Sequence, residues 1–210
     1  MRGDELMAKR IACVVLALVL CVSSVISLAA CSSLPDISRV KDRFIYLIEG
    51  SKDLNVIFFG VGLPTFAREG AISERLGIYY ENKLMSYNTV EIHSPFMSVS
   101  DIKAEAERIF SKDYLDLIYE SAFEGVVGQG STYLRFYELE GEIYQSINAT
   151  DFGLSERIYD YSTMKVVKPS NNEYINITVE SYTLDDPRVR EVALSFVFER
   201  GDWYLDGPTY

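Results

Sequence analysis

The side chains that could act in catalysis are few and far apart along the sequence. His93 is the only histidine, so a metal site built on several imidazoles has too few ligands. Its segment, EIHSPF, also lacks the turn motif that presents a nucleophilic serine. Glu138, Glu140 and Glu142 alternate around Gly141, and paired carboxylates can hydrolyse glycosides. Acids at a hairpin tip are, however, more typical of a solvated edge, so we expect no enzymatic activity.

The motifs that could hold a cofactor or a metal are incomplete. The segment GVG at 60–62 lacks the third glycine of a dinucleotide-binding loop, and GVVGQGS at 125–131 lacks the lysine of a phosphate-binding loop. The segment DDP at 185–187 lacks the alternating oxygen ligands of a calcium loop. We therefore expect no cofactor and no metal.

The three thiols lie in a leader-like segment. Cys13, Cys21 and Cys31 all fall within the first 31 residues, so the remainder has no cysteine for a disulfide or a nucleophile. Residues 11–30 are apolar apart from three serines and follow Lys9-Arg10. A run of this length can span a bilayer, and the same features are typical of a signal peptide, whose start is either Met1 or Met7.

The sequence Leu28-Ala29-Ala30-Cys31 resembles the lipobox of bacterial lipoproteins. The resemblance implies cleavage after Ala30, so that residues 1–30 are a signal peptide. It also implies that Cys31 is the lipidation site and carries a diacylglycerol thioether. We then expect a lipid-anchored protein on the extracytoplasmic face of a cell membrane. A signal anchor with an incidental cysteine is the alternative.

A short tether and a single acidic domain follow. Residues 31–37 form the tether, and residues 38–210 form the domain. The four or five residues before the first helical pattern extend over only about 15–18 Å. The chain carries a net charge of −11, and without residues 1–30 it has 17 basic and 29 acidic residues. Such a surface repels phosphate backbones, so nucleic acid is not an expected partner. Attachment to a membrane must come from the lipid at Cys31.

The apolar pattern predicts an α+β fold. Helical spacing indicates one helix that ends at Gly50, a second that Ser51 begins and Gly60 ends, and a third that Ser98 begins, with a break near Ser111. After residue 131 the spacing changes to two, which predicts strands. Strands are expected around 133–137, 162–167, 175–179, 192–198 and the final residues. We expect the helices to pack on one curved antiparallel meander.

Aromatic residues are abundant, with 15 tyrosines and 11 phenylalanines. Six tyrosines in strand-like stretches either line a cleft or complete the core: Tyr79, Tyr80, Tyr133, Tyr137, Tyr159 and Tyr161. Trp203 follows a tight turn, and we expect it to close the core.

Two segments carry a second resemblance. The ending WYLDGPTY and the helical segment IKAEAERIFSKDYLDLIYESAF resemble small secreted Firmicute envelope proteins of the DL-endopeptidase inhibitor kind. Cystatin-like and NTF2-like domains are similar in wider arrangement. The resemblance implies a non-enzymatic binding or inhibitory module, with a cell-wall component or envelope protein as its partner. The alternative is an NTF2-like small-molecule pocket or enzyme inside the curved sheet.

Overall fold

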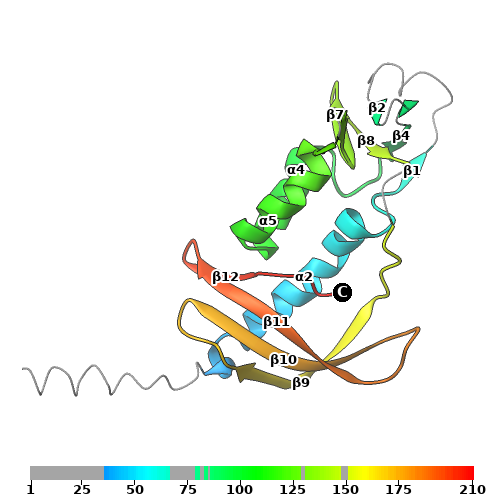
Figure 1. Ribbon diagram of the computed structural model, residues 1–210. Coiled ribbons are helices and arrows are strands. Elements are labelled where there is room, and N and C mark those ends of the chain that lie inside the picture. Colours follow the sequence, from blue (N-terminus) through cyan, green and yellow to red (C-terminus); the bar gives the residue numbers. More distant parts are fainter. Residues whose placement is uncertain (1–35, 67–78, 81–82, 85, 129–130, 148–150) are drawn as a thin grey trace, which may run out of the picture. The chain divides into compact units, whose positions relative to one another are not determined.

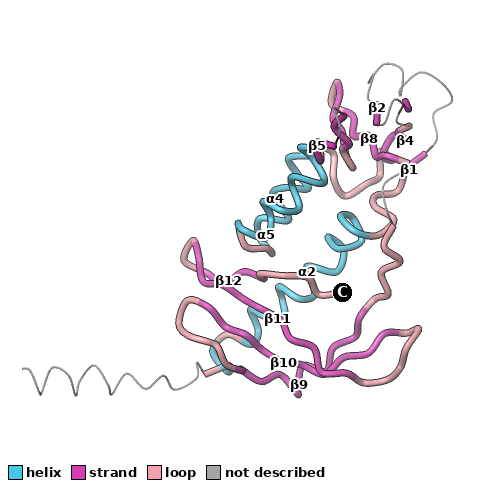
Figure 2. The backbone as a smooth tube through the Cα atoms, viewed as in Figure 1, coloured by secondary structure: helices cyan, strands magenta, loops and turns pink. Residues whose placement is uncertain are grey.

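The computed structural model (Figures 1 and 2) describes residues 36–66, 79–80, 83–84, 86–128, 131–147 and 151–210. All of them belong to one compact unit, Pro35–Tyr210. The lipobox and Cys31 lie outside the described residues. The fold is α+β, as the sequence predicts. No helix in the described ranges combines the length and the hydropathy of a membrane-spanning segment.

One long helix organises the domain. A 3₁₀ turn, η1 (Ile37–Arg39), leads into α2 (Lys41–Phe59), which ends at Gly60. The prediction of two helices that meet at Gly50 is wrong. A Cβ atom at Gly50 would lie 2.6 Å from Ile109 Cδ1, so this glycine allows a neighbouring helix to approach closely.

Three helical segments lie on the two sides of the predicted break near Ser111. They are α4 (Val99–Ile109), α5 (Lys112–Tyr119) and the π-helical turn η2 (Glu120–Glu124). Ser98 caps α4 by accepting a hydrogen bond from Asp101 N, and Ser111 caps α5 by accepting one from Tyr114 N. The predicted start at Ser98 and the break near Ser111 are therefore confirmed.

The C-terminal strands form an antiparallel sheet of order β12-β11-β10-β9. The bounds are β9 (Arg157–Val167), β10 (Tyr174–Thr183), β11 (Arg190–Glu199) and β12 (Asp202–Leu205). One face packs on α2, where Phe44 and Phe196 stack with ring centroids 3.8 Å apart (Figure 1). Trp203 is only partly buried, and its ring meets Phe44 edge-on at 5.6 Å.

A second four-stranded sheet replaces the single meander that we predicted. Its order is β1-β4-β8-β7, with the bounds β1 (Thr65–Phe66), β4 (Tyr87–Val90), β7 (Phe136–Leu139) and β8 (Glu142–Ser146). The hairpin β7–β8 pairs with β4, a strand about 55 residues earlier, and side-chain alternation carries no information on such pairing. Two small ladders complete the strands: β2 (Tyr79–Tyr80) with β3 (Lys83–Leu84), and β5 (Val126–Gly128) with β6 (Ser131–Tyr133).

A buried arginine joins this sheet to the end of α2. Arg135 alternates along the sequence with the apolar Leu134 and Phe136, yet its own side chain is buried. Its Nε donates to Ile57 O at 2.8 Å, and its Nη2 donates to Gly60 O. Arg135 thus binds carbonyls that the last turn of α2 leaves without helical partners.

Candidate functional site

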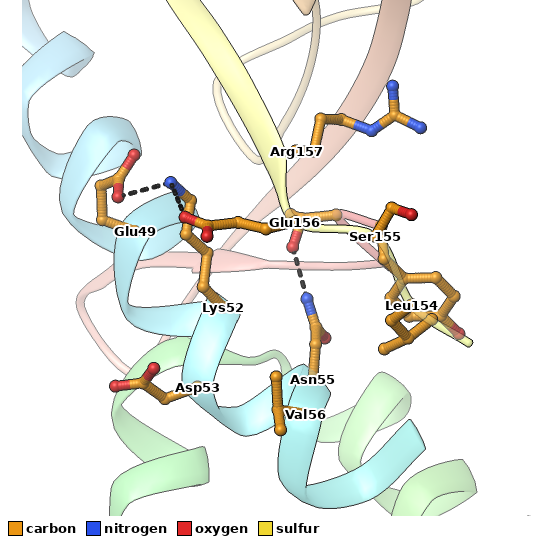
Figure 3. Close-up of a pocket in the computed structure, with 11 residues that line it drawn as sticks. Glu49, Lys52, Asp53, Asn55, Val56, Leu154, Ser155, Glu156 and Arg157 are labelled. Carbon is orange, nitrogen blue, oxygen red and sulfur yellow. Dashed lines mark hydrogen bonds and ion pairs between the residues drawn. The ribbon is translucent and has the colours of Figure 1, made fainter. Parts of the chain in front are cut away.

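A pocket of about 400 Å³ lies beside α2 (Figure 3). Three segments that are distant in sequence form its walls: the exposed side of α2, the stretch that enters β9, and the C-terminal tail. Its lining residues are Glu49, Lys52, Asp53, Asn55, Val56, Leu154, Ser155, Glu156, Arg157, Thr209 and Tyr210. The volume suits a small ligand or one side chain of a larger partner.

The position of the α2 wall follows from the helical period. The residues of α2 that face the core include Phe44, Leu47, Leu54 and Phe58, and Ser51 and Asn55 lie on the same buried stripe. Each residue turns the helix by about 100°, so Lys52 and Val56 lie next to Asn55 at the edge of this stripe, and Asp53 lies on the opposite side of the helix. The helix therefore places two buried polar side chains under the pocket and its charged side chains around it.

A chain of hydrogen bonds fixes the floor of the pocket. Ser51 Oγ donates to Ile48 O at 2.7 Å, so the Ser51 oxygen accepts the 2.6 Å bond from Thr209 Oγ1. Thr209 Oγ1 in turn accepts from Asn55 Nδ2 at 2.7 Å. Each hydroxyl has one proton, so this chain of bonds determines which end of the Asn55 amide faces Thr209.

One acceptor of the Asn55 amide remains unpaired in this arrangement. Asn55 is 4% exposed, and its Oδ1 has no hydrogen-bond partner within the described residues. Buried amide oxygens are normally hydrogen-bonded, and an unpaired one costs about 1–3 kcal/mol. The floor of the pocket thus holds an oriented acceptor without a partner.

The C-terminal tail is held against α2 from both sides. Tyr159 Oη donates to Thr209 O at 2.5 Å, and the Tyr210 ring packs against Phe59 with centroids 5.2 Å apart. Burial raises the pKa of the Tyr159 hydroxyl, so the phenol stays protonated and remains a donor. Because the tail is pinned, it forms a fixed wall of the pocket.

The charged side chains around the pocket are unevenly balanced. Lys52 Nζ lies 2.8 Å from a Glu49 oxygen and 3.8 Å from a Glu156 oxygen. Burial alone would raise the pKa of Glu49, but hydrogen bonds from Lys52 and Tyr161 outweigh it and lower that pKa. Lys52 is therefore neutralised by two carboxylates.

Arginine adds little positive charge to the pocket. The guanidinium of Arg157 points away from α2 (Figure 3), and its Nη1 donates to Ser181 Oγ at 3.1 Å. Asp53, which is exposed, makes no ion pair within the described residues. The carboxylates of Glu49 and Glu156 therefore face the ammonium of Lys52, whereas the Asp53 carboxylate points away from Asn55 and Glu156 (Figure 3).

The rim of the pocket is apolar. Val56 is 41% exposed and Tyr210 is 43% exposed, so both add apolar surface to the rim. Phe152 N donates to Phe59 O at 3.0 Å, and this bond holds the stretch that leads into β9 along the end of α2. The exposed Phe152 ring extends the apolar surface.

The residues that the sequence singled out for catalysis do not meet here. His93 is exposed on a turn after β4, and Glu138, Glu140 and Glu142 are exposed on the hairpin β7–β8. Glu138 Oε2 accepts a hydrogen bond from Val99 N at 2.8 Å and so helps to cap α4. Within the described ranges, no group of three or more histidine, cysteine, aspartate or glutamate side chains could hold a metal ion.

Sequence reasoning found the tyrosines of this site but missed its floor. Tyr159 and Tyr161, which we expected to line a cleft or complete the core, donate to Thr209 and to Glu49. The side chains of Tyr79, Tyr80 and Tyr133 lie outside the described part. Ser51 and Asn55 were missed, although their spacing of four on an apolar stripe was a signal.

In comparisons with known proteins, no family model matches the chain and no curated protein matches it either. The properties of the site therefore rest on its own geometry.

Proposed function

We propose that the chain is a lipid-anchored protein of the extracytoplasmic face of a cell membrane and that its domain is a non-enzymatic binding or inhibitory module. The proposal of an anchor rests on the lipobox-like Leu28-Ala29-Ala30-Cys31, with residues 1–30 as a cleaved signal peptide. The proposed partner is a cell-wall component or an envelope protein, which contacts the pocket beside α2.

One observation carries the proposal of binding. The pocket has a floor that a directional hydrogen-bond chain holds in place, and the unpaired Oδ1 of Asn55 lies covered within that floor. Because the wall is already ordered, ligand binding loses little conformational entropy of the protein, and an oriented acceptor gives specificity. Nothing in the floor supplies a nucleophile with a base, since Ser51 donates its proton to a backbone carbonyl.

The arrangement of helix and sheet supports a binder over the alternative, an NTF2-like pocket inside the curved sheet. The inward face of the sheet β9–β12 is filled: Ile175, Ile177 and Leu194 are buried, and Phe196 stacks on Phe44. A ligand there would have to displace core side chains. We propose that the general arrangement of helices and sheet is cystatin-like or NTF2-like.

The anchor is tested on the full chain in a bacterial host that is fed an alkyne-bearing palmitate. We expect the label on the wild type and its loss in Cys31→Ser, which should accumulate as uncleaved precursor. Cys21→Ser is the matched control and should keep the label. Mass spectrometry that finds an unmodified Cys31 in the mature protein would contradict the proposed anchor.

The binding surface is tested by photocrosslinking in cells. A photoreactive side chain at Val56, on the rim of the pocket, should give a specific adduct, because a partner in the pocket must pass this residue. The matched control is the same side chain at Leu117, which is 67% exposed on α5. Equal adducts from both positions, or an adduct from Leu117 alone, would refute the assignment of the surface.

A further inference from the structure

A second hollow, of about 630 Å³, lies on the flank of α2 that faces α4. Its lining comes from the part of α2 that carries Asp53 and Ile57, from residues 62–64, from residues 95–96, and from Glu105 on α4. Phe96 also lines a smaller hollow of about 100 Å³. The two hollows therefore adjoin at Phe96, and together they are called the Phe96 groove.

Hydrogen bonds hold the two loops that form the walls of this groove. Leu63 N donates to Gln145 Oε1 at 2.7 Å, which fixes the loop after α2. Glu91 N donates to Pro64 O at 2.9 Å, and this bond joins that loop to the segment before α4. Met97 N donates at 3.0 Å to a carboxylate in the first turn of α4. The groove is therefore already shaped, so a ligand orders few additional groups when it binds.

The apolar surface of the groove continues over both hollows. Leu63, Pro64 and Phe96 line the larger one. Ile92 and Met97 line the smaller one, and these two side chains are 76% and 59% exposed. Adjacent exposed side chains of this size mark contact surfaces, whereas scattered single ones do not. An extended chain can cover both hollows at once, and a compact small molecule fills only one, so the groove suits a polypeptide segment.

One end of the groove is acidic. Its described lining there includes the carboxylates of Asp53 and Glu105 and contains neither lysine nor arginine. The Asp53 carboxylate is exposed and forms no ion pair with another described residue, and it points away from Asn55 (Figure 3). Glu105 pairs with Arg108 at 3.0 Å. A cationic group beside Asp53 gains Coulomb energy, whereas an anionic group is repelled.

We infer that the Phe96 groove binds a polypeptide segment of a partner protein in which a lysine or arginine stands next to large apolar side chains. The cationic group lies beside Asp53 and Glu105, and the apolar side chains pack on Leu63, Phe96 and Met97. A second copy of this chain is a poorer occupant, because its net charge of −11 opposes contact with the acidic end. The inference goes beyond the proposed function, since it concerns a different surface from the pocket in Figure 3.

The experiment compares four capped tetrapeptides. Three share the sequence leucine-serine-leucine and end in lysine, glutamine or glutamate, and the fourth is the lysine peptide with both leucines replaced by serine. Each is titrated into the isotopically labelled full chain in nanodiscs of a zwitterionic lipid, and amide chemical shifts are followed by NMR. Empty nanodiscs measure any partition of the peptides into the lipid.

The reporters are the amides of Gly62, Leu63, Phe96 and Met97, which line the groove and not the pocket in Figure 3. We expect saturable shifts there with the leucine-lysine peptide at the lowest concentration, followed by the glutamine peptide and then the glutamate peptide. The all-serine lysine peptide should bind about tenfold more weakly than its leucine counterpart, because it removes less apolar surface from water.

Paired substitutions test the acidic end directly. Asp53→Asn combined with Glu105→Gln should weaken the leucine-lysine peptide by about three- to tenfold, to the level of the glutamine peptide, because exposed charge pairs contribute modestly. Neither side chain is buried, so folding should be preserved. The matched control is Glu107→Gln with Asp116→Asn at exposed positions outside the groove, which changes the net charge equally and should leave the affinity unchanged.

Each result decides for or against the inferred segment. A preference for lysine that requires the leucines and is lost in the Asp53 and Glu105 variant supports the inference. It is overturned if the glutamate peptide or the all-serine peptide binds as tightly, if no peptide shifts the reporter amides, or if shifts are confined to residues 154–157. A concentration-dependent dimer that perturbs the reporter amides in the absence of peptide would also overturn it, in favour of a second copy. Its failure leaves the proposed function unaffected, because that function concerns the pocket lined by residues 154–157.

Discussion

From the hydrogen-bond chain beneath the pocket we predict that a second substitution restores the stability that a first one removes. Thr209→Val keeps the shape of the side chain but removes the hydroxyl that accepts from Asn55 Nδ2. The Asn55 amide then has neither polar atom paired within the described residues, since its Oδ1 already lacks a partner. We expect the free energy of unfolding to fall by about 1–3 kcal/mol, the cost of one buried unpaired donor.

Asn55→Leu should be milder than Thr209→Val. It removes the unpaired oxygen along with the donor, while Thr209 Oγ1 still donates to Ser51 Oγ. When both changes are combined, two apolar side chains of similar shape face each other. The free energy of unfolding should then stay close to that of the wild type. The double variant should therefore be more stable than Thr209→Val alone, with a coupling energy of about 1–2 kcal/mol.

The assay is urea denaturation followed by the fluorescence of Trp203, the only tryptophan in the sequence. Thr178→Val on β10 is the matched control, because its hydroxyl makes no hydrogen bond to another described residue, and it should change stability by less than about 0.5 kcal/mol. A double variant less stable than Thr209→Val would refute the proton assignment along the chain.

Three further predictions concern other parts of the domain. Trp203→Ala should lower the free energy of unfolding by about 2–4 kcal/mol, less than for a fully buried aromatic because the ring is partly exposed; circular dichroism in urea measures this. Arg135→Leu should cost about 2–4 kcal/mol, since it leaves buried carbonyls of the last turn of α2 unpaired, and an unchanged midpoint would contradict the capping role. Hydrogen bonds from Arg188 lower the pKa of Asp186 to about 2, so its stabilising contribution should be complete above about pH 4 and lost as the pH falls through 2. In an NMR titration of the Asp186 carboxyl carbon, Arg188→Gln should return the midpoint toward 3.8.

The sequence predicted the local structure of this domain well where side-chain hydrogen bonds act over a few residues. The caps at Ser98 and Ser111 are of this kind, and the end of α2 at Gly60 depends on backbone hydrogen bonds that are equally local. The split at Gly50 failed, because the reason for that glycine is contact with Ile109, nearly 60 residues away. The in-phase apolar stripe on both sides of Gly50 was the available evidence for a single helix.

The pairing of distant segments could not be predicted from alternation. The period of two identifies a strand and its inward face but not its partner. The strand expected around 133–137 was therefore assigned to the C-terminal meander, whereas β7 pairs with β8 and β8 pairs with β4. Arg135 was missed for the same reason: its partners are carbonyls at the end of α2. The pocket depends on three such distant segments, and only its tyrosines were visible in the pattern.

The buried side of α2 contributes to stability, and its exposed side is available for binding. Its buried side packs Phe44 on the sheet and holds the tail through Ser51 and Asn55, so substitutions there alter the core and the pocket together. Its exposed side carries Asp53 and Val56, which contribute little to packing. A change of binding caused by substitution on the exposed side can be assigned to contact with the ligand, since surface substitutions rarely shift stability by more than about 0.5 kcal/mol. The exposed side of α2 is therefore where a ligand of this domain can be identified without disturbing the fold that holds the pocket.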